Sequence, residues 1–349
     1  MYPRLSVHIV AWNSMRFLPD LLKTLAAQTV GDFAVLVVDN GSTDGLCDFL
    51  REQYPQIILL RNARNLGFSA AHNQAIRYAL ERWQGEDMSD RFVLVANPDL
   101  VLESDCLEKL MAATVAHPSV GAFGAKLRRA FGENQQDEAL FETVKSDLLD
   151  STGLRARKNR TVADRGAGEM DTGQYDDHPE VFGISAALAL YRANALADVR
   201  LQNEFFDQDF FAYKEDVDLA WRLQSAGWDA RFVPEAFAFH YRGMFGKERT
   251  GLFERIRNRR GKSTLRSFYS NRNQWLLLMK NEQIINGLLS LWRVLPLELA
   301  RVLYTALCEP KNLRAFWDAL RLFPCMMKKR RAIALQRKRS SRALRRWFV

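Results

Sequence analysis

Cysteine is scarce in this sequence, with four residues among 349, and no two of them form a CxxC pair. This spacing argues against a disulfide framework and against a cysteine zinc site. No stretch approaches the about 18 consecutive apolar residues of a transmembrane helix. The first residues also lack the order of a signal peptide, which predicts a cytoplasmic protein. Buried, reduced side chains are predicted for Cys47, Cys106, Cys308 and Cys325.

Negative charge is scarce in the last third of the chain. Residues 241–349 contain 26 Lys plus Arg against 6 Asp plus Glu, although the whole chain carries a net charge of only +9. The remaining body is therefore acidic. A basic segment of this kind can meet nucleic acid, anionic lipid or substrate phosphate.

The body is predicted to be an α/β unit with a mostly parallel sheet. Short apolar runs alternate with helix-period segments, as in strands joined by crossover helices, and the 48% hydrophobic content supports a packed core. Strands are expected at 5–11, 33–38, 57–60, 92–96, 120–123, 182–191 and 231–233, and a helix at 215–226.

Between about Arg128 and Glu180 the pattern dissolves into charged and glycine-containing sequence. We predict a long, partly mobile excursion there, because irregular segments of this length are usually functional or disordered. Beyond residue 245, apolar residues recur at helical spacing and are interrupted by three prolines. The sequence therefore predicts a body at 1–245 and a basic amphipathic tail at 246–349, with helices at 269–279, 284–307 and 313–327 interrupted at Pro296, Pro310 and Pro324.

Polar residues follow the second predicted strand in Val37-Val-Asp-Asn-Gly-Ser-Thr-Asp44. Ligands of open parallel sheets bind at the carboxyl ends of strands, so Asp39 and Asn40 would face a crevice. Gly41 allows the sharp turn that follows. An ordinary polar turn with a helix cap explains this segment equally well.

A second polar group, Asn97-Pro-Asp99, follows the fourth predicted strand. A carboxylate delivered to that edge suits a hard divalent cation that bridges a diphosphate. The tripeptide is also common turn chemistry.

A third group is the acidic helix start at Glu215, Asp216 and Asp218. A favourable acidic first turn accounts for it, because the helix dipole favours negative charge there. Alternatively, one carboxylate beside the preceding aromatic residues is a general base, and Asp216 is the better candidate. Asp218 is positioned for an ion pair with Arg222 at i+4.

Two further segments are weaker. His240 lies between aromatic residues, where a hydrogen-bonded structural histidine is commoner than a metal ligand. The turn that contains Asn65, Gly67 and Asn73 would bring amide groups against a nucleotide. It matches neither the GxGxxG nor the GxxxxGK[ST] motif, so dinucleotide and P-loop sites are not indicated.

Taken in order, the segments Ile9-Val-Ala-Trp-Asn-Ser14, Val38-Asp-Asn-Gly-Ser-Thr-Asp44, Asn65-Leu-Gly-Phe68 with Asn73, Asn97-Pro-Asp99 and Tyr213-Lys-Glu-Asp-Val-Asp-Leu219 resemble those of family 2 glycosyltransferases. The resemblance covers residues 4–242 and is strongest to the bacterial rhamnosyltransferase-like branch. It implies a GT-A fold, which is Rossmann-like, followed here by the α-helical tail. It also implies a nucleotide-sugar donor held by Ala11, Asn13, Asp39, Asn40, Asn65, Gly67, Asn73 and Asn97.

The same resemblance implies a divalent cation, Mg²⁺ or Mn²⁺, on Asp99 and His240, with Asp216 as the base of an inverting displacement. Asn97 departs from the aspartate that usually opens the metal motif, which leaves fewer charged ligands. The implied reaction moves a sugar, L-rhamnose first and otherwise the sugar of a UDP-sugar or GDP-mannose, to a glycan or lipid-linked glycan hydroxyl in surface polysaccharide synthesis. The excursion is expected to order over the donor as a lid.

The tail allows two interpretations. It is either a set of helices packed on the body or an interfacial anchor on the inner face of the cytoplasmic membrane, with tryptophans among leucines and arginines at anionic lipid. We favour the membrane and predict headgroup contacts for Trp275, Trp292, Trp317 and Trp347. A nucleic-acid-binding protein is the alternative from another class, although the tail contains no recognisable module. A non-catalytic sugar-nucleotide binder is disfavoured because Asp39, Asp99 and Asp216 occur together.

Overall fold

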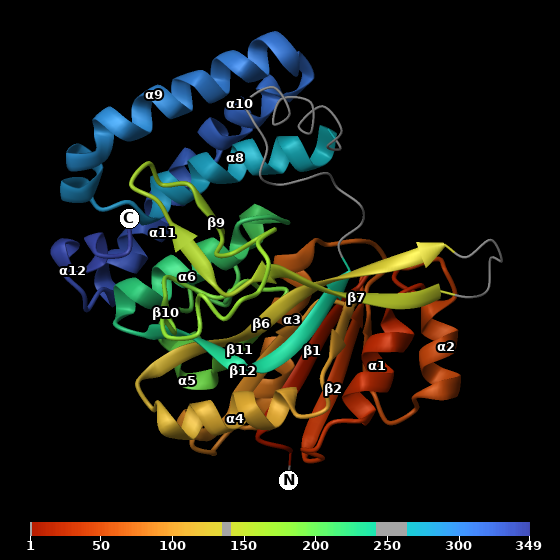
Figure 1. Cartoon of the computed structure of the whole chain (residues 1–349). Coiled ribbons are helices and arrows are strands. Elements are labelled where there is room, and N and C mark those ends of the chain that lie inside the picture. Colours follow the sequence, from red (N-terminus) through yellow and green to blue (C-terminus); the bar gives the residue numbers. More distant parts are fainter. Residues whose placement is uncertain (1, 135–140, 242–263) are drawn as a thin grey trace.

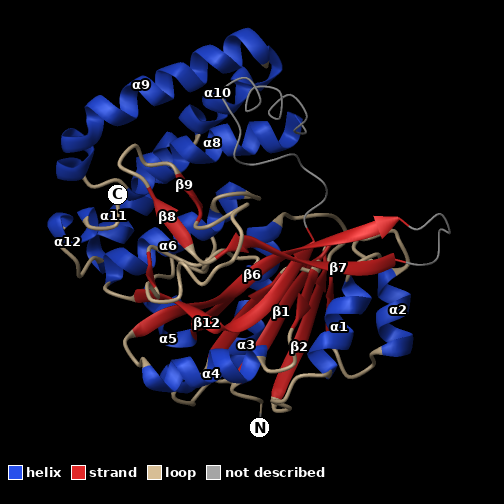
Figure 2. Cartoon of the chain, viewed as in Figure 1, coloured by secondary structure: helices blue, strands red, loops and turns tan. Residues whose placement is uncertain are grey.

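The computed structural model describes residues 2–134, 141–241 and 264–349. Its centre is a ten-stranded mixed sheet with helices on both faces (Figures 1 and 2). Eight strands follow the order β10-β12-β6-β11-β4-β1-β2-β3, while β5 pairs with β12 and β7 with β6. The strands of this sheet are β1 Leu5–Ala11, β2 Phe33–Asp39, β3 Ile58–Arg61, β4 Phe92–Ala96, β5 Leu100–Leu102, β6 Val120–Asn134, β7 Phe141–Ser151, β10 Glu180–Val181, β11 Leu188–Arg192 and β12 Asp229–Tyr241.

The four strands from β3 to β4 are parallel, as their continuous apolar runs predicted. Beyond β4, the antiparallel strand β11 joins this parallel part to β6 and β12, which are parallel to each other. The sheet is therefore mixed, and the predicted α/β class is confirmed.

Helices cover both faces of the sheet because each presents an apolar stripe to it. Two large apolar clusters result, one under α1, α2 and α4 and the other under α3, α5 and α6. These helices are α1 Leu18–Ala26, α2 Leu46–Gln53, α3 Phe68–Arg82, α4 Cys106–Ala116, α5 Ala193–Asp198 and α6 Glu215–Ala226, with short 3-10 helices η1 Met88–Asp90 and η2 Gln208–Phe210. The helix predicted at 215–226 has the expected bounds.

The excursion contains more regular structure than its sequence indicated. Strands β6 and β7 form a long antiparallel hairpin, and β8 (Leu154–Ala156) pairs with β9 (Val162–Asp164). Polar residues build this region through ion pairs, for example between buried Lys126 and Asp176 at 2.7 Å. The expectation of irregular chain was wrong in these described stretches, because charge pairing replaces the apolar alternation on which strand prediction relies. The lid role stays a prediction.

The tail consists of helices α8 Thr264–Asn281, α9 Ile284–Cys308, α10 Arg314–Arg321, α11 Phe323–Gln336 and α12 Ser341–Arg345, with η3 at Pro310–Leu313. Helix α9 lies outermost in Figure 1, and α8 and α11 pack against α6. The predicted interruption at Pro296 was wrong, since α9 continues through it. A helix of 25 residues tolerates the roughly 3 kcal/mol cost of one proline. None of the helices in the described ranges combines the length and apolarity that crossing a bilayer requires.

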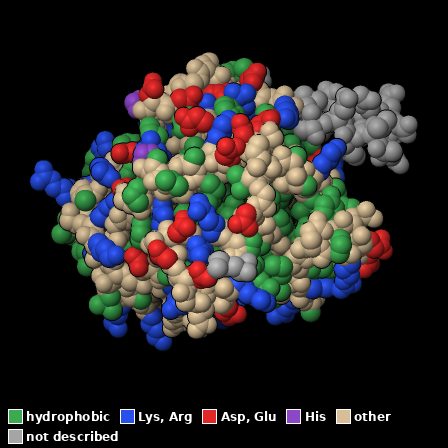
Figure 3. Space-filling model, turned by 90° about the horizontal axis from the view of Figure 1, so that it is seen from below, with side chains coloured by type: hydrophobic (Ala, Val, Ile, Leu, Met, Phe, Trp, Pro, Cys, Tyr) green, Lys and Arg blue, Asp and Glu red, His purple; other side chains and the backbone are tan. Residues whose placement is uncertain are grey.

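The prediction for the cysteines was correct in part. All four thiols are free, but only Cys47 and Cys106 are buried, while Cys325 is half-buried and Cys308 is exposed. Cys308 lies at the end of α9, whose outer surface is open. On the opposite side of the molecule, near the N-terminal end, Lys and Arg side chains are interspersed with Asp and Glu (Figure 3).

Candidate functional site

The strand register brings the first two motifs to one edge of the sheet. Ala11, the last residue of β1, pairs with Asp39, the last residue of β2. On the other side of β1, Ile9 pairs with Ala96, which directly precedes Asn97. The carboxyl ends of these three strands therefore meet, as the parallel arrangement predicted.

Asp39 is fully buried at this edge. One carboxylate oxygen accepts a hydrogen bond from the backbone N–H of Ser42 at 2.8 Å, and the other accepts from the thiol of Cys47 at 2.8 Å. The guanidinium of Arg61 lies 3.4 Å from the second oxygen. Burial and the bond to Asp39 raise the pKa of the Cys47 thiol to about 11. Asp39 is thus held rigidly at the crevice, with a cation beside it.

Asn13 lies in the loop after β1 and adopts a positive φ of 49°. Its side-chain oxygen accepts from the Thr43 N–H at 2.9 Å, and its own N–H donates to the Ser42 hydroxyl at 2.9 Å. These bonds join the loop after β1 to the loop after β2. The predicted donor residues Ala11, Asn13 and Asp39 therefore lie together where the two loops meet, with Ala11 and Asp39 fully buried.

Asn40 and Asn65 form a second network. The Asn40 amide donates to the side-chain oxygen of Asn65 at 2.9 Å, and that oxygen also accepts from the Gly67 N–H at 2.8 Å. Gly67 has a φ of 85°, and a Cβ there would lie 2.6 Å from the carbonyl oxygen of Phe211. Only glycine fits this contact, so the motif holds the Phe211 loop as well as lining the edge.

Asn73 has a structural environment. It is fully buried, its amide donates to the carbonyl of Phe206 at 2.7 Å, and its oxygen accepts from the N–H groups of Phe205 and Phe206 at 3.0 and 2.9 Å. These bonds use its amide group to fix the 205–206 segment. The geometry does not support the predicted donor contact at Asn73.

His240 joins two carboxylates. Its Nε2 lies 3.2 Å from Asp99 and 3.5 Å from the Asn97 amide, and its Nδ1 lies 2.8 Å from Asp150. Burial alone would lower the pKa of His240, but the hydrogen bonds to Asp150 and Asp99 outweigh it and raise this pKa to about 9. Asp150 is 90 residues away in the chain and was not among the predicted site residues. No sequence signal in the excursion distinguished it.

These groups fit a divalent cation that is shared with a ligand. A carboxylate on Nδ1 is the arrangement that orients a metal-binding histidine, so Asp150 would direct Nε2 of His240 toward Asp99. In the described ranges, no three His, Cys, Asp or Glu residues are grouped as a complete metal site. One carboxylate and one imidazole would leave positions for phosphate oxygens and water, which Mg²⁺ and Mn²⁺ readily accept.

Asp216 lies in the first turn of α6 and is half-buried. Its carboxylate accepts from the N–H groups of Val217 at 2.7 Å and Ala186 at 3.4 Å. The next residue, Ala187, accepts from the N–H of Asn97 at 2.8 Å, so two adjacent residues link the base candidate to the metal motif. Burial and the negative charge of Asp164 raise the pKa of Asp216 to about 6.

The two neighbouring acids have different environments. Asp218 is fully buried and pairs with Arg222 at 2.9 Å, as the i+4 spacing predicted, and also with Lys280 at 2.7 Å. Glu215 is buried, and burial together with Asp216 raises its pKa. Asp216 is thus the half-exposed member of the acidic turn, which suits proton transfer to a ligand.

The loop before Asp216 is strained and is held by the tail. Phe211, Tyr213 and Lys214 all have φ between 60° and 70°. Asn273 of α8 donates one amide to the carbonyls of Phe210, Ala212 and Tyr213 at 2.9, 2.8 and 2.7 Å. Such backbone strain persists only where surrounding contacts enforce it. Sequence reasoning missed Asn273, because nothing distinguishes it from other polar residues of a helix.

Together these groups can bind an anionic ligand at the sheet edge and remove a proton beside it. The buried Asp39 and the amide network would hold a nucleotide. Asp99 and His240 would bind a cation for the diphosphate, and Asp216 can accept the proton.

Comparisons with known proteins identify the family of the chain. Residues 3–264 match the family model "Glycosyltransferase like family 2". A Mycobacterium tuberculosis (strain CDC 1551 / Oshkosh) protein named N-acetylglucosaminyl-diphospho-decaprenol L-rhamnosyltransferase is 31% identical over 248 residues, 68% of this chain and 76% of that protein. Rhamnosyltransferase WbbL of Escherichia coli (strain K12) is 28% identical over 186 residues, 50% of this chain and 61% of that protein.

Solved structures share the fold at low sequence identity. S. aureus TarS 1-349 covers 96% of this chain, with a TM-score of 0.52 and 14% identity, and 89% of that structure is matched. GalNAc-T7, solved with UDP, GalNAc and Mn²⁺, covers 79% of this chain with a TM-score of 0.55 and 12% identity, over 48% of its own length.

Proposed function

The chain belongs to the family 2 glycosyltransferases and has the GT-A fold, as its motifs predicted, and from this premise we propose that it is an inverting enzyme acting on a lipid-linked glycan. The sugar is L-rhamnose in the first instance, taken from a nucleotide-sugar donor and transferred to a hydroxyl during bacterial surface polysaccharide synthesis. The observation that carries the proposal is the position of Asp216. It is only partly buried and is linked through Ala186 and Ala187 to the Asn97-Pro-Asp99 motif.

Asp216 is proposed to take the proton of the acceptor hydroxyl as that oxygen attacks the anomeric carbon. The bond to the nucleoside diphosphate breaks in the same displacement, which inverts the configuration. A base with a pKa of about 6 is ionised at neutral pH and still accepts a proton readily. Asn273 and Gly67 keep the preceding loop in place, so the base is positioned before the substrate arrives.

Asp99 and His240 are proposed to hold Mg²⁺ or Mn²⁺, which neutralises the charge of the leaving diphosphate when it is bound. Asp150 would keep the imidazole in the orientation that this requires. Ala11, Asn13, Asp39, Asn40, Asn65, Gly67 and Asn97 are proposed to line the donor subsite.

L-Rhamnose is preferred because the two relatives described above carry rhamnosyltransferase names. A UDP-sugar or GDP-mannose is the alternative donor. The mycobacterial relative's name specifies a sugar on a diphospho-decaprenol as its acceptor, which supports a lipid-linked acceptor here. Such an acceptor requires the enzyme to work at a membrane, so we propose peripheral attachment to the inner face of the cytoplasmic membrane.

A donor panel tests this function. Purified protein would be given dTDP-L-rhamnose, UDP-sugars and GDP-mannose, with and without a bacterial membrane extract, and nucleoside diphosphate release would be measured. We expect release that depends on one donor and on the extract. Asp216→Asn should keep donor binding and lose at least about 100-fold in turnover. Near-normal turnover in that variant would refute the assignment of the base.

A further inference from the structure

Helix α9 buries polar residues and exposes apolar ones, which is the opposite of a helix packed on the core of a soluble protein. The side chains it buries include the polar residues Asn286, Ser290, Glu298 and Thr305. Its large apolar residues point outward and recur every three or four positions along its length. The exposed set, between 48% and 74% accessible, is Ile284, Ile285, Leu288, Leu289, Leu291, Trp292, Leu295, Leu299, Leu303 and Leu307.

Such a surface is unfavourable in water. We call this surface the α9 face. Burying one large apolar side chain stabilises by about 1.5 to 3 kcal/mol, so transfer of the α9 face from water to an apolar phase is strongly favourable. Of the four tryptophans predicted at the lipid headgroups, Trp292 lies on the α9 face and Trp317 is exposed on α10. Trp275 and Trp347 are instead half-buried in the cluster under the tail. The face therefore gives the proposed membrane contact a definite location.

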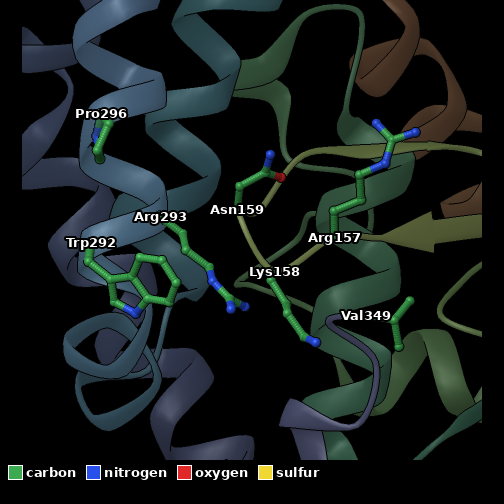
Figure 4. A pocket seen from close by; sticks show the side chains of 7 residues that line it. All are labelled: Arg157, Lys158, Asn159, Trp292, Arg293, Pro296 and Val349. Atoms are coloured by element: carbon green, nitrogen blue, oxygen red, sulfur yellow. The ribbon is translucent and has the colours of Figure 1, made fainter.

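A hollow of about 480 Å³ adjoins the α9 face. Trp292, Arg293 and Pro296 line it from α9, and the turn Arg157–Asn159 between β8 and β9 lines the other side, with Val349 below (Figure 4). The side chain of Arg293 extends from α9 toward the turn, Lys158 extends beside it toward Val349, and Arg157 points away from α9 at the rim. The guanidinium of Arg293 also lies 4.2 Å from the ring centroid of Trp292.

In the part of the chain that the structure describes, the basic side chains of this hollow have no acidic side chain as a partner. Within residues 2–134, 141–241 and 264–349, no carboxylate side chain forms an ion pair with Arg157, Lys158 or Arg293, although an oxygen of Val349, the last residue of the sequence, accepts from the backbone N–H of Lys158 at 3.2 Å. Cations gathered around one hollow repel one another unless an anion lies among them. The phosphate of a lipid whose chain follows the α9 face has the complementary charge and shape.

The hollow is connected to the base candidate. The turn that carries Lys158 continues to Arg160, which is anchored to Glu282 just before α9 and whose carbonyl accepts from Gln274 of α8. Strand β9 then ends at Asp164, the residue that raises the pKa of Asp216. The same short hairpin thus borders the hollow at its turn and carries at its other end a charge that acts on the base.

We propose that this hollow binds the diphosphate of the lipid-linked acceptor, with the lipid chain along the α9 face and the sugar extending toward Asp216. This assignment rests on the proposed function, and it names the part of the acceptor that the tail recognises. A phospholipid headgroup shares the phosphate chemistry. The diphosphate is favoured because three basic residues line this one hollow, which suits two phosphates, and because the hairpin continues toward the base.

Vesicle flotation of the full chain tests the proposal. Phosphatidylcholine vesicles would contain either phosphatidylglycerol or a polyprenyl diphosphate at equal negative charge. The wild type should partition more strongly to the diphosphate vesicles. Lys158→Ala/Arg293→Ala should lose that preference, by about 30-fold if each cation contributes about fivefold. The control, Lys23→Ala/Arg200→Ala, removes the same charge from exposed positions on the body and should retain the preference.

Equal losses on both kinds of vesicle would show a general headgroup contact and overturn the diphosphate assignment, as would an equal loss in the control. Replacing Leu295, Leu299 and Leu303 by Gln should weaken flotation on both vesicles, and unchanged flotation would overturn the lipid contact of α9. Thermal unfolding followed by circular dichroism checks that each variant is folded. These readouts need no sugar donor, so failure of the donor panel and failure of this proposal are distinguishable.

Discussion

Lys280 offers the sharpest test of how the tail supports the site. Its ammonium group is fully buried between the carboxylates of Asp207 and Asp218, which are also fully buried. Asp218 belongs to α6, two residues after the base candidate, and Asp207 begins the loop that leads to it. Lys280→Met keeps the unbranched stem and removes the charge.

The expected loss follows from the charges that remain. Removing one partner of a buried ion pair costs about 3 to 5 kcal/mol, because the other charge is left without compensation. Here Asp218 keeps Arg222 at 2.9 Å, and Asp207 keeps Lys329 at 2.5 Å. We therefore expect the lower end, about 3 kcal/mol in the free energy of unfolding. Lys329→Met should cost only about 1 kcal/mol, because its side chain is 15% exposed, whereas that of Lys280 is fully buried, and water replaces part of the interaction.

Urea unfolding of the full chain, followed by tryptophan fluorescence, measures both variants. Turnover of Lys280→Met should fall as well, because Asp218 and the Asp207 loop would relax around the base. A loss below about 1 kcal/mol for Lys280→Met, or a larger loss for Lys329→Met, would refute the reasoning that this junction is dry and tightly paired.

Three further predictions concern single positions. Turnover should rise with pH through about 6, where Asp216 loses its proton, and Asp164→Asn should move that midpoint to lower pH; a pH-rate profile checks both. Gly67→Ala should strongly reduce turnover and lower the melting temperature, because a Cβ at this position, where φ is 85°, would collide with Phe211. Calorimetry and the donor assay measure these two effects, and an unchanged melting temperature together with unchanged turnover would contradict the prediction. A maleimide reagent should label Cys308 far faster than the two buried thiols, and mass spectrometry of the native protein measures the difference.

The helices and strands that were predicted correctly are those whose apolar residues repeat within a single short segment. The helix at 215–226 and the strands at 33–38 and 92–96 were found because each bears its apolar period within a few residues. The hairpins of the excursion were missed because they depend on residues far apart in the chain, both buried apolar residues such as Leu154 and Ala156 and paired charges. Lys126, for example, finds Asp171 and Asp176 some 45 and 50 residues later.

The site residues that were predicted are likewise those that short sequence motifs contain. Motif order was sufficient to suggest Asp39, Asp99 and Asp216, and the structure places all three on strand ends or a helix start that meet at one edge. Asp150 could not be found in this way, because its importance depends on the pairing of β12 with β6 and of β6 with β7. Asn73 shows the opposite error, since a motif residue proved to hold the backbone.

Composition and charge divided the chain near residue 245, but contacts in the structure cross that boundary. Asn273 holds the loop before Asp216, and Lys280 neutralises the acids around it, so α8 completes the catalytic body. The next helix, α9, begins only two residues after α8 ends and carries the outward apolar face. A helix clamped to the base loop is therefore followed almost immediately by the one proposed to lie in lipid. Because α8 has little freedom to move, docking of α9 on a membrane would fix the height of the base above the lipid phosphates. A tail docked in this way would select acceptors by how far the sugar projects from its carrier, because the strained loop has little room to adjust that distance.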